Sequence, residues 1–496
     1  MRVRSPMLQN ALWLTGSELF LRAISMLFQV YLSNRMGAAG VGLLQLLLTV
    51  GTLATTLALS GVKVSAMYLT AREAGRGDSL GVCSAVGACL RYALLVSGCA
   101  AALLYSLSGM IAERFVQDRA ALAGLRAYAV FLPCGCLASV MHGYSIACGK
   151  VRRLVLTELA ERFLSIGLTV ALLYPAQGDV AQSLFAVVTG ASAPPLLSFL
   201  ILFAAYRREH RTLARRRRKP MAQALLKLSL PLALSDYLRA GLNTVEQFLI
   251  PYGLAQASSR YAALSAYGTV VGMVFPVLMF PSAILHAVGD LLVPELSRCT
   301  ARGATVRIRS LTERFLRLGA LFASVLFGVL FCGADALGML LYHSGQTGFY
   351  LRLLSPMVLF LYLDVLVDGM QKGLGQQVYT VRYNTATNVL DVLGLYTLLP
   401  RFGLSGYLFT YAVSHLVNFF LSLRRLLTVT QLRPSLAAFA RLLTTTLISI
   451  AAASALPVGT SPAASLLRVV LFLLLLSLGC RLFLLPQERA FKKRLV

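Results

Sequence analysis

Charged and amide side chains recur at helical spacing inside stretches of this chain that are otherwise apolar. Three stripes each fall on one face of a helix at about 100° per residue. They are Glu18, Arg22, Ser25 and Gln29; Glu158, Glu161, Arg162, Ser165 and Thr169; and Asp236, Arg239, Asn243 and Glu246. A charge at the centre of a bilayer costs about 3 kcal/mol, so these faces are expected to meet water, a ligand or a partner. Their chemistry is that of anion binding by guanidinium groups and cation or proton binding by carboxylates.

Further polar residues stand in other apolar stretches. Arg91 has no carboxylate near it in sequence. Three later stretches carry Asp364 and Asp368; Asn384, Asn388 and Asp391; and Tyr411, His415 and Asn418. The segment 275–299 combines His286 and Asp290, one turn apart on one face, with Pro276 and Pro281. Because proline removes a backbone donor, we expect these two prolines to bend the helix.

Packing offers an alternative explanation for several of these residues. Glu18 with Arg22, or Asp236 with Arg239, would neutralise each other and fix helix packing. Asp364 and Asp368 would reach the membrane surface if they lie near a helix end. No Walker motif, zinc-protease motif, nucleophile elbow or metal-ligand spacing occurs, so we expect a transporter rather than an enzyme and no cofactor other than a coupling ion, a proton or sodium.

The elements that must position these residues are membrane helices. The chain has 496 residues, of which 57% are hydrophobic and 13% charged. Apolar runs long enough to cross a bilayer follow one another, separated by short connections. We predict an all-α polytopic protein with fourteen spans, at 9–33, 40–68, 81–109, 122–148, 152–174, 180–206, 222–252, 262–293, 311–333, 348–373, 379–400, 404–426, 436–457 and 463–485.

The net charge of +27 reports topology rather than nucleic-acid binding. Arginine and lysine gather in alternate connections, together with both ends of the chain. The positive-inside rule then predicts two cytoplasmic termini and an even number of spans. The basic run 207–219 is expected to contact anionic headgroups of the inner leaflet, in the cytoplasmic membrane of a bacterium.

An internal repeat organises the spans. A shift of 226 residues places "HGYSIACGK" (142–150) over "DGMQKGLGQ" (368–376) and "TAREAGRG" (70–77) over "LSRCTARG" (296–303). We predict an N-lobe at 1–205, a basic linker at 206–221, a C-lobe at 222–427, and two extra spans with a basic tail at 428–496. Two six-helix lobes related by a pseudo-two-fold axis along the membrane normal are typical of alternating-access transporters.

Five stretches resemble the multidrug/oligosaccharidyl-lipid/polysaccharide (MOP) exporter superfamily. They are "LFLRAISMLFQVYLSNRMGAAGVGLLQL", "HGYSIACGKVRRLVLTELAERF", "LSLPLALSDYLRAGLNTVEQFLI", "FPVLMFPSAILHAVGDLLVPELS" and "QKGLGQQ". The resemblance is strongest to the oligosaccharide flippase and stage V sporulation protein B branch, related to the MurJ-type lipid II flippases. It covers both halves of the chain.

The resemblance implies a cationic cavity that holds the diphosphate of an undecaprenyl-linked sugar. Arg22 matches an arginine common in the first span of this group, whereas Gln29 stands where a second arginine is usual, and Glu161 matches a frequent acid. The arginine fork suits a diphosphate, which makes Arg22, Arg91 and Arg239 the candidate ligands. The polar cavity candidates, some of them coupling candidates, are Glu18, Gln29, Glu158, Glu161, Arg162, Asp236, Asn243, Glu246, His286, Asp290, Asn388 and Asp391.

The implied function is a flippase that moves a polyprenyl-diphosphate-linked oligosaccharide or peptidoglycan precursor outward, working as a monomer. Two other functions stay open at this stage. One is a cation-coupled multidrug exporter of the same superfamily, and the other is a membrane scaffold in cell-wall or spore assembly that transports nothing.

Overall fold

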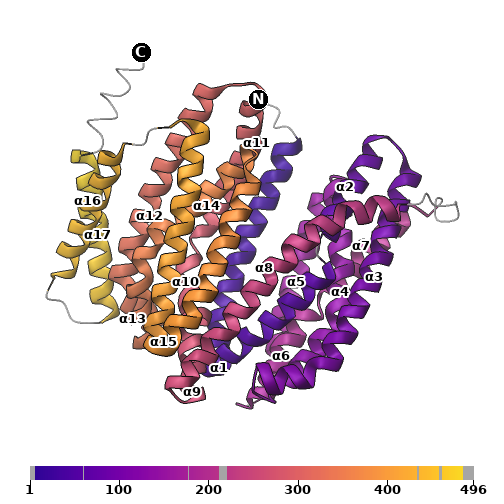
Figure 1. The fold of residues 1–496 in the computed structure, drawn as a ribbon, viewed down its shortest axis with the longest axis horizontal. Coiled ribbons are helices and arrows are strands. Elements are labelled where there is room, and N and C mark those ends of the chain that lie inside the picture. Colours follow the sequence, from indigo (N-terminus) through magenta and orange to yellow (C-terminus); the bar gives the residue numbers. More distant parts are fainter. Residues whose placement is uncertain are drawn as a thin grey trace. The chain divides into compact units, whose positions relative to one another are not determined.

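The computed structural model describes residues 6–59, 61–176, 178–211, 221–432, 435–456 and 461–483. The described residues form helices and short connections, without a β-strand (Figure 1). Up to residue 257 the elements are α1 (Pro6–Leu59), α2 (Val62–Gly75), α3 (Ser79–Met110), η1 (Ile111–Phe115), α4 (Ala121–Ala147), α5 (Val151–Leu173), α6 (Val180–Ser192), α7 (Pro195–Glu209) and α8 (Ala222–Ala257).

The remaining elements follow in the same pattern. They are α9 (Arg260–Tyr267), the π-helical η2 (Gly268–Val274), α10 (Phe275–Met279), α11 (Ser282–Ala301), α12 (Thr305–Tyr342), α13 (Gly345–Leu354), η3 (Ser355–Met357), α14 (Val358–Gly373), α15 (Gln377–Thr430), α16 (Leu436–Ser454) and α17 (Pro462–Phe483). The basic run from residue 212 to 220 and the tail from 484 lie outside the described residues.

Ten segments of the described chain are long and apolar enough to cross a membrane. The helices α1 and α15 each have 54 residues, or about 80 Å at 1.5 Å per residue, far more than a bilayer core of about 30 Å. Each is interrupted by a glycine outside helical geometry, Gly37 (φ 70°) in α1 and Gly403 (φ 55°) in α15. Each of the predicted spans overlaps a helix, and the number fourteen stays a prediction.

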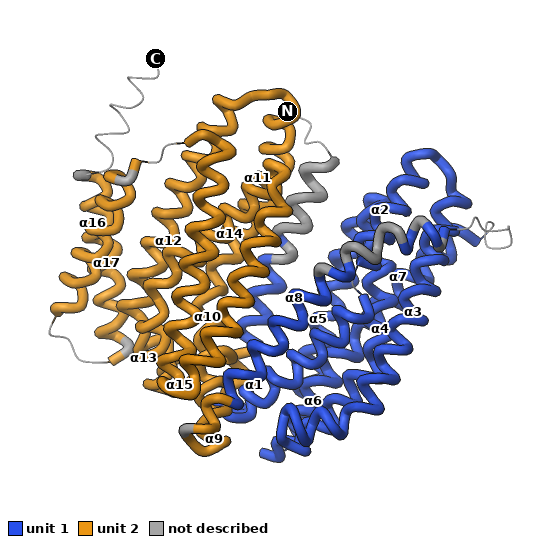
Figure 2. Tube along the Cα trace, in the orientation of Figure 1, with its two compact units in different colours: residues 1–28, 35–252 blue, residues 29–34, 253–496 orange. Residues whose placement is uncertain are grey.

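The chain forms two compact units (Figure 2). Unit 1 contains residues 1–28 and 35–252, and unit 2 contains residues 29–34 and 253–496. The helix α8, which opens the predicted second half, is therefore grouped with unit 1 up to Tyr252. The predicted lobes were drawn from the repeat, and their boundaries remain a prediction.

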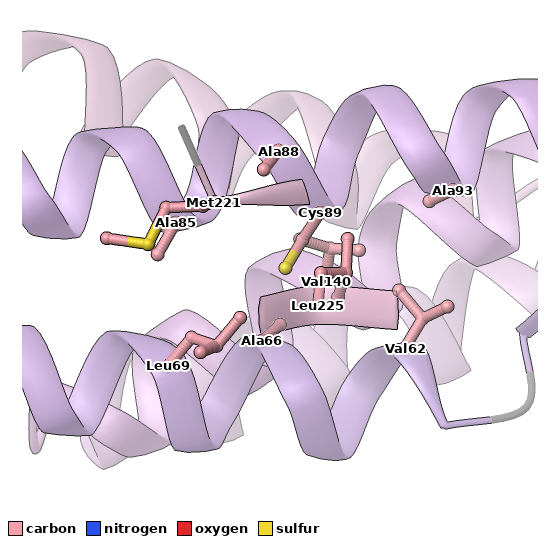
Figure 3. Close-up of a cluster of buried hydrophobic side chains, with 10 residues drawn as sticks. All are labelled: Val62, Ala66, Leu69, Ala85, Ala88, Cys89, Ala93, Val140, Met221 and Leu225. Atoms are coloured by element: carbon pink, nitrogen blue, oxygen red, sulfur yellow. The ribbon is translucent and has the colours of Figure 1, made fainter. Parts of the chain in front are cut away.

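The core of unit 1 shows why α8 belongs there. Leu225 at the start of α8 and Met221 just before it are buried among small and branched side chains of α2, α3 and α4 (Figure 3). Ala66, Ala85 and Cys89 are each fully buried in this cluster. Small side chains let membrane helices approach closely, which gives dispersion contacts where no hydrophobic driving force exists between them. Further along α8, the Tyr237 hydroxyl donates a hydrogen bond to the Leu57 carbonyl (3.1 Å).

The core of unit 2 is built around α12, which packs against α13, α14, α16 and α17. The fully buried ring of Phe472 on α17 fills the space above Gly328 of α12, where an added Cβ would lie 1.9 Å from a ring carbon. Residues 29–34 of α1 join this unit through the amide of Asn34, which donates to the Leu341 carbonyl (2.7 Å).

The predicted repeat is confirmed in the local structure of two turns. Gly77 (φ 70°) ends the first and Gly303 (φ 64°) its counterpart, and their amides donate to the carbonyls of Ala74 and Thr300. The turn after α4 matches the turn after α14 in the same way. Gly149 has φ 69° and Gly375 has φ 71°. The bonds that close this pair run from Lys150 to the Ser145 carbonyl (2.8 Å) and from Gln376 to the Gln371 carbonyl (2.8 Å).

A helix crossing is repeated at the same offset. A Cβ on Gly143 would lie 2.8 Å from the carbonyl oxygen of Lys63, and a Cβ on Gly369 would lie 2.8 Å from the Cα of Gly289. Lys63 and Gly289, like Gly143 and Gly369, are 226 residues apart. Each unit thus has one place where two backbones touch and only glycine fits.

Candidate functional site

The three predicted arginines lie on three helices of unit 1. Arg22 is on α1, Arg91 on α3 and Arg239 on α8, and all three side chains are exposed rather than covered by other helices. Among the described residues none of the three forms an ion pair. Arg91 donates its Nε hydrogen to the Gly87 carbonyl of its own helix (3.1 Å), which leaves the rest of its fork free of protein partners. These are cations inside apolar helices that the described protein does not neutralise.

The two acids of α5 have partners inside unit 1. Glu158 Oε1 lies 3.6 Å from His142 Nδ1 on α4, and Glu161 accepts a hydrogen bond from the hydroxyl of Ser198 on α7. Arg162, the next residue along α5, is exposed. The stripe predicted on α5 therefore divides into acids that join helices and a cation that does not.

Residues of α1 and α8 make the remaining part of the predicted stripes. The Gln29 amide donates to the Gly272 carbonyl in the π-helical segment η2 (3.1 Å), where i+5 spacing leaves carbonyls open to side chains. Asp236 and Asn243 are exposed and Glu246 is half-buried. The side chain of Glu18 lies outside the described residues.

The proline-containing stretch is interrupted rather than continuous. After η2 the chain forms the short helix α10, in which Pro276 lies in the first turn, where a missing amide hydrogen is tolerated. Pro281 precedes α11, and Pro294 stays inside that helix. His286 and Asp290 are both exposed on α11.

Polar residues of α14 and α15 form a buried seam in unit 2. We define the α14–α15 seam as Asp364 and Gln371 on α14 with Asn418 and Ser422 on α15. The Asn418 amide donates to Asp364 Oδ2 (3.0 Å), and the Gln371 amide donates to the Ser422 carbonyl (2.6 Å). The predicted candidate Asp391 is buried on the other arm of α15, and Asn388 is half-buried.

Sequence reasoning did not single out His142, Ser198, Gln371 or Ser422. His142 and Ser198 carried no signal beyond a polar residue in an apolar run, because a contact between separate helices is not encoded in helical spacing. Asp364, Asp368 and Asn418 were visible as stripes, but their pairing across helices was not. Among the described residues no group of three His, Cys, Asp or Glu side chains is arranged to hold a metal ion.

Solved structures with the same fold are membrane transporters. The lipid II flippase MurJ in an inward closed conformation aligns over 95% of this chain and 98% of its own, with a TM-score of 0.70 and 11% identity. An inward-facing multidrug resistance MATE family transporter of the MOP superfamily aligns over 83% of this chain and 96% of its own, with a TM-score of 0.62 and 15% identity. The helices of this chain therefore define a membrane protein with the fold of MOP-superfamily transporters.

Sequence comparison narrows this class to a family. Residues 7–300 match the family model described as "Polysaccharide biosynthesis protein". Because that match covers more than half of the chain, the chain belongs to this family. Stage V sporulation protein B of Bacillus subtilis (strain 168) is 24% identical over 370 residues, 72% of this chain and 71% of that protein. Sporulation protein YkvU of the same organism is 24% identical over 280 residues, 54% of this chain and 61% of that protein.

Proposed function

We propose that this protein is a flippase for a polyprenyl-diphosphate-linked sugar, an oligosaccharide or a peptidoglycan precursor, and that Arg22, Arg91 and Arg239 bind the diphosphate. The observation that supports this most directly is the exposure of the three guanidinium groups without an acidic partner among the described residues. An organic cation would be repelled by them, whereas a diphosphate would accept paired hydrogen bonds.

The mechanism we propose is alternating access. The charged headgroup enters a polar cavity while the polyprenyl tail stays in lipid, because a diphosphate in hydrocarbon would be left without hydrogen bonds or counter-charge. The apolar side chains exposed on the helices, such as Leu95, Leu238 and Leu474, suit contact with lipid tails. The carboxylates Glu158, Glu161, Asp236 and Glu246 are proposed to balance the cavity charge or to carry a coupling ion.

The cargo is tested by asking whether this chain rescues bacteria depleted of their lipid II flippase. Rescue is expected from the wild-type chain, and loss of rescue from Arg22→Ala combined with Arg239→Ala. Arg126→Ala is the matched control, because Arg126 is an exposed arginine of the same unit that already contacts Ser108 and lies over the ring of Tyr105. Protein level in the membrane is measured for every variant.

Two outcomes would favour the other functions. Failure to rescue together with increased resistance to cationic drugs would indicate a multidrug exporter. A deletion phenotype in cell-wall or spore assembly that the arginine variants complement fully would indicate a scaffold. Flipping that is unchanged in a folded Arg22→Ala, Arg239→Ala double variant would show that the arginine assignment is wrong.

A further inference from the structure

The α14–α15 seam contains oxygen atoms that the described protein leaves unsatisfied. Asp364 uses Oδ2 to accept from Asn418, but its Oδ1 is buried and has no hydrogen-bond partner among the described residues. The side-chain oxygen of Asn418 and the hydroxyl of Ser422 are in the same position. Asn418 is 8% exposed and Ser422 0%. A buried polar atom without a partner costs roughly 1–3 kcal/mol, so three in one seam call for a ligand.

The three atoms lie on facing surfaces of two packed helices. Asn418 and Ser422 are one turn apart on α15, and the bond from Gln371 to the Ser422 carbonyl holds the next turn of α14 against them. Gln371 in turn accepts from Thr380 (2.5 Å), so both ends of its amide are occupied and its orientation is fixed. The seam is thus held from the cytoplasmic side of the pair by bonds that do not use the three free oxygens.

The chemistry of these atoms is that of a small hard cation. A carboxylate, an amide carbonyl and a hydroxyl are all oxygen donors, with neither a sulfur nor an imidazole among them. One carboxylate oxygen free for binding matches one positive charge, which leaves a neutral pair in a medium where an unpaired charge is costly. A divalent ion would retain an excess charge there and normally takes six or more oxygen ligands.

We propose that the α14–α15 seam is a sodium site in which Asp364 Oδ1, the Asn418 side-chain oxygen and the Ser422 hydroxyl bind the ion. Sodium binding would stabilise the contact between α14 and the second arm of α15. Its use as the driving ion of transport rests on the function proposed above. The binding itself does not depend on the cargo.

The test is sodium binding by the purified full-length protein in lipid nanodiscs. Saturable binding of ²²Na⁺ is expected, together with a melting temperature that rises as NaCl replaces choline chloride at constant ionic strength, because a ligand of the folded state stabilises it. Asp364→Asn keeps the shape of the side chain but removes its charge. It should weaken sodium binding by at least about tenfold, as expected when a charged partner is lost, and Asn418→Leu should do the same.

Asp335→Asn is the matched control. Asp335 is an acid of unit 2 that pairs with Arg352, away from the seam, so this variant should bind sodium like the wild type. Absence of a sodium-dependent shift in the wild-type protein would overturn the site, in favour of a water or a protonated carboxyl at Asp364. Wild-type affinity in a folded Asp364→Asn variant would overturn it too. Sodium binding without any flipping would uphold the site and contradict the proposed cargo instead.

Discussion

Single side chains in this protein serve two different purposes. Some charges are neutralised by neighbours, as with Glu73, which is buried beside Arg72 and Arg76, and others are left uncovered, as with Arg22. Helical spacing predicted that both kinds would lie on stripes, but it could not separate them. Whether a charge has a partner depends on a second helix, and the sequence of one helix does not contain that information.

Glu209 is the clearest neutralised charge at the end of unit 1. It accepts hydrogen bonds from Lys150, from Arg153 (2.9 Å) and from the Tyr144 hydroxyl (3.1 Å), which joins the turn after α4 to the end of α7. Glu209→Gln should lower the free energy of unfolding by about 1 kcal/mol, a small value because these side chains are partly solvated. Thermal unfolding in detergent measures it.

The control for this prediction is Glu113→Gln. Glu113 pairs with Arg119 alone, and both side chains are exposed, at 53% and 84%. Exposed pairs contribute little, so the control should melt with the wild type. Equal melting temperatures for Glu209→Gln and Glu113→Gln would contradict the idea that Glu209 joins the two helices.

At the scale of elements, apolar length and composition predicted where helices lie, but not where they break. Each predicted span coincides with a helix, since hydropathy measures what a bilayer accepts. The π-helical turn of η2 and the break at Pro281 were visible only as prolines. The grouping of α8 with unit 1 was not visible, because all membrane helices carry similar apolar faces and sequence does not say which of them pack together.

The contact of α12 with α17 gives a prediction for an element. Phe472→Ala should leave a cavity above Gly328 and destabilise the protein by on the order of 2 kcal/mol. Gly328→Leu should destabilise it by a different route, since its side chain would overlap the ring of Phe472. Unfolding of the purified protein, followed by thermal melting, reports both.

The double variant distinguishes these routes from unrelated damage. In Gly328→Leu with Phe472→Ala, the leucine enters the space that the ring has left, so the combined loss should be smaller than the sum of the two single losses. Additive losses would mean that the two residues do not share one space.

For the whole molecule, the sequence predicted the repeat, and the structure shows it in the matched turns at Gly77 and Gly303 and at Gly149 and Gly375. The predicted lobe boundaries, the fourteen crossings and the cytoplasmic termini are properties of the chain in its membrane. They depend on the placement of charged loops across a bilayer rather than on contacts within either unit.

Topology is therefore the prediction to test at this scale. Fluorescent protein fused to the C-terminus should fluoresce, and alkaline phosphatase fused there should be inactive, because both ends are expected in the cytoplasm. Fusions after Gly178 and after His343 should give the opposite result, since both positions fall in connections predicted to lie outside. An active phosphatase at the C-terminus would exclude an even number of spans.

The paired glycine crossings have a consequence for mutational tolerance. If Gly143 and Gly369 are both places where two backbones touch, their tolerance of substitution is correlated even though they are far apart in the chain. A saturation-mutagenesis map of this protein would then show two depleted columns separated by 226 positions. Correlated intolerance of that kind would reveal an ancient duplication through fitness alone, in a chain whose two halves have otherwise diverged in sequence.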